Sequence, residues 1–548
     1  MKRLLLNLIR ILSRYGWNAT LVILGLLAAG FTWSSSDELY DYIKLIDRAA
    51  LAINSSYVEE IDNFDLVTAG IDGMISKLDA HSKLLTGSEY LYLKQETDGE
   101  FEGIGVSLAV HHDTLTVESI LEDSPAYFHG LRPGDRIVGV DGADVSGTDI
   151  SDVKMKLRGP SGTSVSLRIH RPGDGELDFT LVRGKVELKA IPYFAMISSN
   201  IGYVKLMRFS DGSSRQMRSA IRELKKQNMR SLIVDLRDNP GGLLLESVKI
   251  ASMFLPANTG IVETRTRGNA VSESYSSAGE PDFQSGELIV LVNSQTASAA
   301  EIVAGAIQDH DRGIIIGSTT YGKGLVQQVM QFTDDTALKL TTAKYFLPSG
   351  RCLQKPDWMK AAKSTNDERL DSLFRTDSGR LVFGGGGILP DVYIDDQLVA
   401  PFVEALIWNS CFFDYAVDFL KTHVINPDYK INDTLMADFE RFLKTSGFQY
   451  RSADRISLDN FEDSLSISSD SLTFALGLID REIARRERWQ FDSNYAYISR
   501  NLRQSMIHLA YGDEAIYRIE MTPTEPGIAR AIRVIADTNQ YNSILATH

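Results

Sequence analysis

Apolar positions along the chain follow different periods, and each period predicts a different structure. Between residues 37 and 92 they recur every three or four residues, which predicts amphipathic helices. Between residues 93 and 186 apolar and polar residues alternate and turns intervene, which predicts a compact β-rich module. The segments that carry these patterns are "LYDYIKLIDRAALAI" and "FDLVTAGIDGMISKL" for the helices, and "GIGVSLAV", "TLTVESI", "RIVGVDG" and "SVSLRIHR" for the strands.

From residue 187 to residue 397 continuous apolar runs alternate with amphipathic segments. The runs "SLIVDLR" and "ELIVLVN" are typical of buried strands, and "SSRQMRSAIRELKKQ" and "ASAAEIVAGAIQD" of helices. This alternation predicts an α/β layer around a largely parallel sheet, with ligand sites at the carboxyl ends of strands. Residues 398–548 are expected to be mostly helical. The fold class is therefore a multidomain α/β protein with an inserted β module.

The N-terminus carries an export pattern. Lys2, Arg3, Arg10 and Arg14 precede an apolar run from Trp17 to Trp33. Such a run after basic residues is typical of a signal peptide or a membrane anchor, and its length is at the lower limit for spanning a bilayer. We favour an uncleaved anchor within residues 1–36 over a cleaved signal. The basic side would stay in the cytoplasm, so the protein would face the periplasm from the inner membrane, or be exported.

Charge and cysteine content exclude several classes of function. The net charge is −15, from 57 basic and 72 acidic residues, which argues against broad nucleic-acid binding. The two cysteines, Cys352 and Cys411, cannot form a disulfide framework, and no Cys/His zinc pattern is present. His111-His112 is interpreted as a strand end rather than as a metal site. We expect no metal and no cofactor.

The stretch "GSTTYGKGLVQQ" resembles a phosphate-binding loop at Gly317, Gly322 and Lys323. The motif continues with Ser or Thr, which holds magnesium, and then opens a helix. Here Gly324 follows the lysine, and the next residues read as a strand. An ATPase is therefore a disfavoured alternative, which detectable ATP binding would revive.

Three segments at predicted strand ends carry candidate chemistry: Asp235–Gly242, Asn293–Glu301 and Gly317–Gln328. Ser298 begins a predicted helix, so the amide of the next residue, Ala299, is free to stabilise an oxyanion. The pattern from Ser298 to Glu301 is also that of a capping box, which needs no catalysis. Both interpretations remain open from the residues alone.

No histidine stands out as a base for this serine, but a neutral lysine can serve. The pKa of Lys323 would have to fall from about 10.4 to roughly 7–8, which burial among apolar neighbours can achieve. Tyr321, Leu325 and Val326 are the candidate neighbours. The alternative is a solvated lysine in a glycine turn. Asp309 lies about 16 Å beyond Ser298 along the helix, so a structural salt link is expected for it.

Ser298, Lys323 and Gln327 resemble the Ser-Lys-Gln site of the carboxy-terminal processing proteases, also called tail-specific proteases. Thr296–Glu301 is close to the family's S-A-S-x-x-E, with Thr296 in place of the first serine, and Gly322–Gln327 matches G-K-G-x-x-Q. Lys323 follows Ser298 by 25 residues, as in the family. Further matches are "DLRDNPGG", "PSGR", "GYVKL" and "LDAHS", where Ala80 replaces the family's usual proline. The resemblance covers about residues 40–395.

The resemblance implies a role for each residue. Ser298 would be the nucleophile, Lys323 the general base and Gln327 the residue that orients the lysine. The oxyanion hole would combine the amide of Ala299 with that of Gly241 or Gly242, and the sequence does not decide between these two. In a flat strand Lys323 and Gln327 would lie about 13 Å apart, so a contact requires a bulge or a turn.

The β-rich module resembles a PDZ domain. Gly103-Ile104-Gly105-Val106 matches the G-L-G-F loop whose amides capture a C-terminal carboxylate, and "SPAYFHGLRPGDRIVGVDG" follows it. The implied partners are proteins with accessible C-terminal tails; the alternative is a module that only spaces or gates the active site.

Together these features predict a serine endopeptidase that cuts proteins near their C-termini. A catalytically silent PDZ scaffold is the alternative from another class. A second copy of the chain, in a homo-oligomer, is also among the expected partners.

Overall fold

A computed structural model describes residues 39–355, 373–395, 399–465 and 469–546. The predicted export segment, residues 1–36, lies outside the described residues, and no helix among those described is both long and apolar enough to cross a membrane. The chain divides into two compact units. The first contains residues up to Leu85 together with Val329–Phe332 and Ala337–Leu340, and the second contains the remainder.

The first unit confirms the predicted N-terminal helices. Residues 39–56 are helical, and α2 spans Asn63–Ile75. The Asp62 side chain caps α2 by accepting hydrogen bonds from the amides of Phe64 and Asp65, which satisfies donors that a helix start leaves free. Strand β1 (Lys83–Thr86) follows.

The β-rich module forms a sheet in the order β3-β4-β5-β7-β8, with β6 beside β5 and with α5 (Ile150–Leu157). β3 ends at His111, which confirms that this histidine is a strand end. The bounds of the sheet strands and of the elements around them are α3 (Ser88–Asp98), β2 (Glu100–Gly103), β3 (Val106–His111), β4 (Thr114–Ile120), α4 (Pro125–Phe128), β5 (Arg136–Val140), β6 (Ala143–Asp144), β7 (Ser164–Arg171), β8 (Gly175–Val182) and β9 (Gly184–Glu187).

The core of the second unit is a six-stranded sheet in the order β10-β11-β12-β15-β16-β21. All neighbouring strands are parallel except β10, which runs antiparallel at one edge. The largely parallel sheet is therefore confirmed. Its strands are β10 (Tyr193–Met196), β11 (Ile201–Lys205), β12 (Ser231–Asp235), β15 (Leu288–Val292), β16 (Ile314–Gly317) and β21 (Val392–Tyr393).

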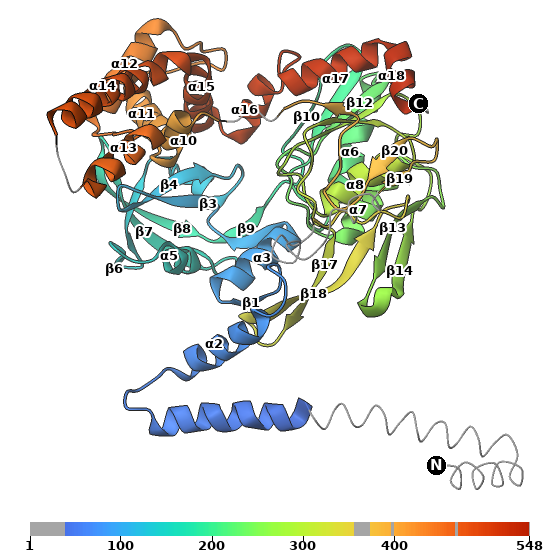
Figure 1. The fold of residues 1–548 in the computed structure, drawn as a ribbon, viewed down its shortest axis with the longest axis horizontal. Coiled ribbons are helices and arrows are strands. Elements are labelled where there is room, and N and C mark those ends of the chain that lie inside the picture. The colour runs from blue at the N-terminus through green and yellow to red at the C-terminus, as the bar shows by residue number, and fades with distance from the viewer. Residues whose placement is uncertain (1–38, 356–372, 396–398, 466–468, 547–548) are drawn as a thin grey trace, which may run out of the picture. The chain divides into compact units, whose positions relative to one another are not determined.

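Helices cover both faces of this sheet. α6 (Ser213–Lys226), α7 (Leu244–Ala251) and α8 (Ala299–Asp309) share one hydrophobic core with alternate residues of the strands. The intervening strand residues form a second core with α17 (Pro526–Ala536) and α18 (Thr538–Leu545) (Figure 1). The last two helices, which the sequence assigns to the helical C-terminal region, thus cover one face of the six-stranded sheet.

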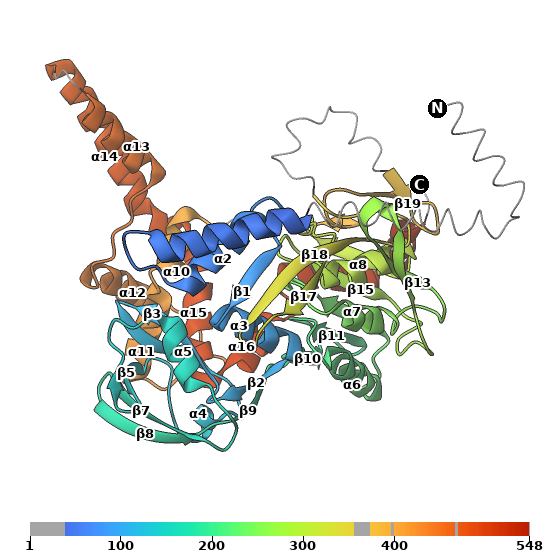
Figure 2. The ribbon, with the colours of Figure 1, turned by 90° about the horizontal axis from the view of Figure 1, so that it is seen from below.

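A smaller set of strands lies beside the sheet. β13 (Gly260–Arg265) pairs antiparallel with β14 (Val271–Ser276) and with the end of β18 (Thr336–Phe346). β17 (Leu325–Gln331) pairs with β18, and the two lie side by side in Figure 2. β19 (Leu373–Arg375) and β20 (Leu381–Phe383) form a short hairpin.

The helical C-terminal region has a core of its own, rich in aromatic residues. Its helices are α10 (Pro401–Trp408), α11 (Cys411–Leu420), α12 (Asp433–Thr445), α13 (Ala453–Ser464), α14 (Asp470–Ser493), α15 (Tyr495–Tyr511) and α16 (Asp513–Glu520).

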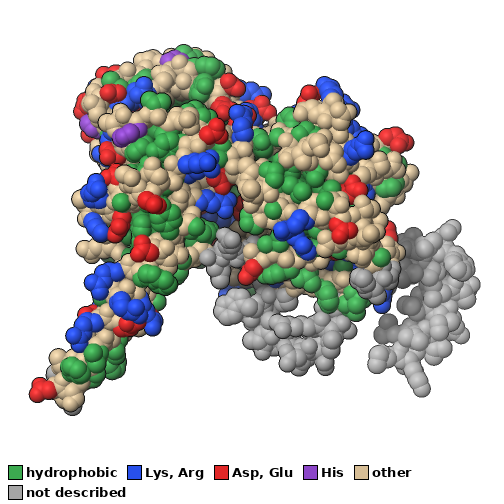
Figure 3. Space-filling model, turned by 90° about the horizontal axis from the view of Figure 1, so that it is seen from above, with side chains coloured by type: hydrophobic (Ala, Val, Ile, Leu, Met, Phe, Trp, Pro, Cys, Tyr) green, Lys and Arg blue, Asp and Glu red, His purple; other side chains and the backbone are tan. Residues whose placement is uncertain are grey.

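On the face that Figure 3 presents, acidic and basic side chains are interspersed. That face offers no continuous basic surface, in line with the acidic composition.

Candidate active site

Ser298 lies between β15 and α8, at the carboxyl end of a parallel strand. Its φ of 56° and ψ of −116° place a non-glycine residue in a sparsely populated region, and such strain clusters at functional sites. The side chain is half-buried. The amide of Ala299 begins α8 and has no acceptor among the described residues.

Glu301 joins the serine to the lysine segment. Its side chain is fully buried, and its Oε2 accepts hydrogen bonds from the amides of Ser298 at 2.8 Å and Lys323 at 2.9 Å. Its Oε1 accepts from the Thr320 hydroxyl at 2.5 Å and the Gly322 amide at 2.8 Å. Burial raises the pKa of Glu301, and these hydrogen bonds oppose the rise. The predicted capping contact therefore exists, and the same carboxylate also joins the backbone of Ser298 to that of Lys323.

Lys323 lies in a turn that leads into β17. Gly322 has a φ of +84°, which supplies the predicted backbone turn. Lys323 is half-buried rather than fully buried. Leu325 is buried, as expected for an apolar neighbour of the lysine, whereas Tyr321 is 45% exposed.

The segment after the lysine is a strand and not a helix. A phosphate loop must open a helix, so the geometry disagrees with the nucleotide alternative. Gln327 lies on β17, and its Nε2 donates to the Thr341 hydroxyl at 3.3 Å.

The two glycines of "DNPGG" differ in what their amides bind. The Gly241 amide donates to Asn239 Oδ1 at 2.8 Å, whereas the Gly242 amide has no acceptor among the described residues. A Cβ on Gly241 would lie 2.9 Å from the Ala299 nitrogen, and one on Gly242 would lie 2.3 Å from the Phe209 carbonyl oxygen. Both positions therefore require glycine, and the free amide is that of Gly242.

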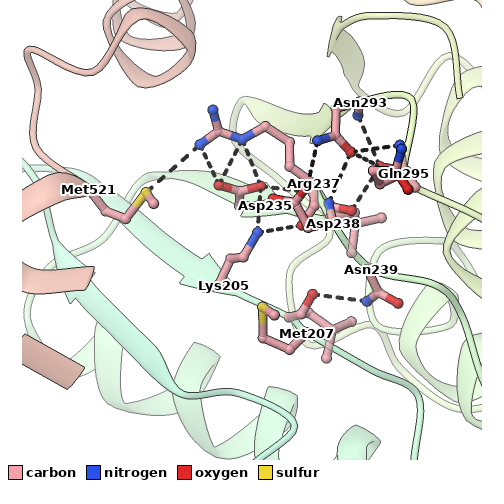
Figure 4. A network of polar contacts seen from close by, with 12 residues as sticks. Lys205, Met207, Asp235, Arg237, Asp238, Asn239, Asn293, Gln295 and Met521 are labelled. Atoms are coloured by element: carbon pink, nitrogen blue, oxygen red, sulfur yellow. Dashed lines mark hydrogen bonds and ion pairs between the residues drawn. The ribbon is translucent and has the colours of Figure 1, made fainter. Parts of the chain in front are cut away.

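Hydrogen bonds lock this glycine turn to the serine turn. The Ala297 amide donates to the Asn239 carbonyl at 2.9 Å. Asp238 and Asn293 exchange two hydrogen bonds, from the Asp238 amide at 2.9 Å and from Asn293 Nδ2 at 2.8 Å (Figure 4). The Thr296 hydroxyl donates to the Leu236 carbonyl at 2.8 Å. Since several bonds join them, the two turns are held as one unit.

A network of charged side chains from Lys205, Asp235 and Arg237 lies at the end of β12, which leads into the glycine turn (Figure 4). Asp235 binds Arg237 through two nitrogens and Lys205 Nζ at 3.4 Å. Burial would raise the pKa of Asp235, but the charges of Arg237 and Lys205 outweigh it and hold this pKa well below its usual range. Arg237 also pairs with Glu525 at 2.8 Å, just before α17. The end of the chain is thus tied to the strand that carries the turn.

Two further buried side chains, Asp309 and Tyr345, make polar contacts around α8 and the serine turn. Asp309 forms an ion pair of 2.7 Å with Arg351, and both side chains are buried. This confirms the expected structural salt link. The Tyr345 hydroxyl donates to the Ser298 carbonyl at 3.3 Å and to the Lys323 carbonyl. Tyr345 lies on β18, and no sequence signal singled it out; the only sign was its place just before "PSGR".

The predicted carboxylate-binding loop turns sharply at Gly105, whose φ is +81°. The carbonyls of Ile104 and Gly105 are engaged by the amides of Ala126 at 2.8 Å and Leu121 at 3.0 Å. Gly103 ends β2 and Val106 begins β3. β3 is an edge strand of its sheet, as strand addition by a peptide requires.

No cluster of His, Cys, Asp and Glu able to hold a metal ion occurs in the part of the chain that the structure describes. The residues that the structure brings together at the site offer a hydroxyl, an amine and oriented amides.

Comparison with known protein families defines the class of this protein. Residues 200–359 match peptidase family S41, residues 116–171 match the PDZ domain, and residues 402–535 match the C-terminal helical domain of probable PDZ-proteases. Together with a serine at the end of a parallel strand, these matches define a serine-type peptidase with a PDZ domain and a helical C-terminal domain.

The chain belongs to the carboxy-terminal processing proteases. It is 34% identical over 344 residues to a carboxy-terminal-processing protease of Bartonella bacilliformis, covering 62% of this chain and 77% of that protein. It is 33% identical to a probable CtpA-like serine protease of Staphylococcus haemolyticus, covering 61% and 70%. A solved structure of a photosystem II D1 C-terminal processing protease matches at 26% identity with a TM-score of 0.37, covering 66% of this chain and 95% of that one.

Proposed function

We propose that Ser298 and Lys323 form the catalytic dyad of this peptidase. Neutral Lys323 Nζ accepts the proton of the Ser298 hydroxyl while the Ser298 oxygen attacks the carbon of the scissile carbonyl. The proton then passes to the departing amine, and water hydrolyses the acyl-enzyme. The supporting observation is that one oxygen of Glu301 binds the amides of both residues. Gln327, on the strand after the lysine, would orient Lys323.

The oxyanion hole is assigned to the amides of Ala299 and Gly242. Both lack an acceptor among the described residues, whereas the Gly241 amide is occupied by Asn239. Ala299 also begins α8, so the helix dipole favours negative charge there. Gly241 would instead allow the glycine turn to approach the serine turn closely, because a Cβ at this position would collide with Ser298 and Ala299.

The test of the dyad is labelling by a fluorophosphonate, an electrophile that reacts with activated serines. The wild-type protein is expected to be labelled at Ser298, as mapped by peptide mass spectrometry, and Lys323→Met to be labelled more slowly. A silent PDZ scaffold, the second candidate, predicts no labelling of the folded protein. Labelling at a different serine would also contradict the assignment.

The PDZ domain is assigned to the recognition of C-terminal tails of protein substrates. Gly103, Ile104, Gly105 and Val106 form the turn before an exposed strand edge, so a tail carboxylate would meet the loop's amides while its main chain extends β3. Because charge-assisted hydrogen bonds to the carboxylate supply much of the affinity, the free carboxylate should matter more than any single side chain.

Amidating the C-terminus of a bound peptide is therefore expected to weaken binding by about 10-fold or more, the loss of one hydrogen bond to a charged group. The measurement is fluorescence anisotropy with matched acid and amide peptides. Gly105→Ala should weaken the acid peptide similarly, because its Cβ would lie 2.2 Å from the Cβ of Ser124. Gly162→Ala is the matched control, with a φ of +88° but open space around it. Equal binding of both peptides would contradict tail capture.

We also propose that residues 1–36 anchor the protein on the periplasmic side of the inner membrane. Support comes from the basic residues before the apolar run in the sequence. Assembly into a homo-oligomer is retained as part of the proposal. Fractionation of cells that produce the full chain and a chain starting at residue 37 would test the anchor: only the former should sediment with membranes.

A further inference from the structure

We propose that Tyr345 is a positioning residue of the catalytic site, holding Lys323 against Ser298 through their carbonyl oxygens. Its hydroxyl donates to the carbonyl of Ser298 at 3.3 Å and to that of Lys323. A hydroxyl has one proton, so the two carbonyls share it. The inference rests on the proposed dyad and adds a third element to it.

Glu301 and Tyr345 together hold the main chains of Ser298 and Lys323 from two sides, and we call this pair the clamp. Glu301 Oε2 binds the amide nitrogens of Ser298 and Lys323, and the Tyr345 hydroxyl binds their carbonyl oxygens. The main chains of both catalytic residues are thereby fixed at both polar groups by the same pair of side chains. Since displacement by about 1 Å can cost roughly 100-fold in rate, a clamp of this kind has direct consequences for catalysis.

Tyr345 suits this task because it cannot move or ionise easily. Its side chain is 1% exposed and lies within the main hydrophobic core. Its own amide donates to the Gly324 carbonyl at 3.0 Å, so β18 is tied directly to the lysine turn. Burial, and next the charge of Glu301, raise the pKa of Tyr345 well above its usual value. The hydroxyl therefore remains a donor wherever the enzyme works.

Tyr345→Phe tests the inference because it keeps the ring and removes only the donor. We expect kcat to fall by about 10- to 100-fold with KM little changed, and fluorophosphonate labelling of Ser298 to slow by a similar factor. Tyr541→Phe is the matched control. Its hydroxyl also bonds backbone groups in a core, those of Leu288 at 3.0 and 3.2 Å, but away from Ser298. It should lower Tm, because a buried hydrogen-bonding group is lost, and leave kcat unchanged.

A second pair of variants covers the case in which Tyr345→Phe does not fold. 4-Aminophenylalanine and 4-fluorophenylalanine at position 345 both fill the space of the hydroxyl, but only the amine can donate. The amino variant should keep most of kcat and the fluoro variant should lose it. Equal kcat in both variants would overturn the inference. So would a Tyr345→Phe protein with wild-type kcat and reduced Tm, because Tyr345 would then contribute only packing. The dyad itself would stand, because it is tested by Ser298 and Lys323 variants.

Discussion

Ser298→Ala is expected to abolish peptide hydrolysis, with a loss in kcat of about 10⁴-fold or more. The hydroxyl is the only group in the proposed mechanism that forms a covalent bond with substrate. Amides that remain in the oxyanion hole can still bind the carbonyl, but they cannot cleave it. The measurement is turnover of a denatured protein substrate with a defined C-terminal tail, followed by mass spectrometry.

The fold should survive this change. Alanine is strained by the φ of 56° no more than serine is, and loss of a capping hydroxyl costs about 1 kcal/mol. Ser294→Ala provides the matched control, because Ser294 is exposed in the same turn and outside the proposed dyad. Full activity of Ser298→Ala, or equal losses in both variants, would remove Ser298 as the nucleophile.

Lys323→Met is expected to reduce kcat to a similar extent, because it keeps the length of the side chain and removes the base. Lys323→His should not restore activity, since the imidazole has a shorter reach. The base must be neutral to accept the serine proton, so activity should rise with pH through the pKa of the lysine. Because the proposed mechanism needs the amine neutral at the working pH, the midpoint is expected below about 10.4, the value for a free lysine.

The pH profile of kcat/KM checks this expectation, because it reports the ionisation of the free enzyme. The profile of the Tyr541→Phe control should match that of the wild type. A midpoint at the value of a solvated lysine, or substantial turnover by Lys323→Met, would show that another group is the base. Glu301 is an unsuitable substitute, because its carboxylate already accepts four hydrogen bonds.

Much of the fold could be predicted because burial leaves a local record in the sequence. Continuous apolar runs marked β12 and β15 as strands buried on both faces, and an amphipathic pattern marked α6. The return of α17 to the protease sheet was not predictable in this way. An amphipathic helix shows that it has an apolar face, but its period does not say which sheet that face covers.

The residues of the candidate site also divide into those that the local sequence indicates and those that only the tertiary structure reveals. The sequence by itself singled out Ser298, Ala299 and Lys323 by residue type and position, and the resemblance to the family supplied their proposed roles as nucleophile, oxyanion donor and base. Only the tertiary structure decided that Gly242 rather than Gly241 has an amide without an acceptor among the described residues, and that Glu301 and Tyr345 bind the main chains of both Ser298 and Lys323. These facts depend on hydrogen bonds between segments far apart in the chain. Such bonds have no period and no local composition, so they exist only once the turns have been brought together.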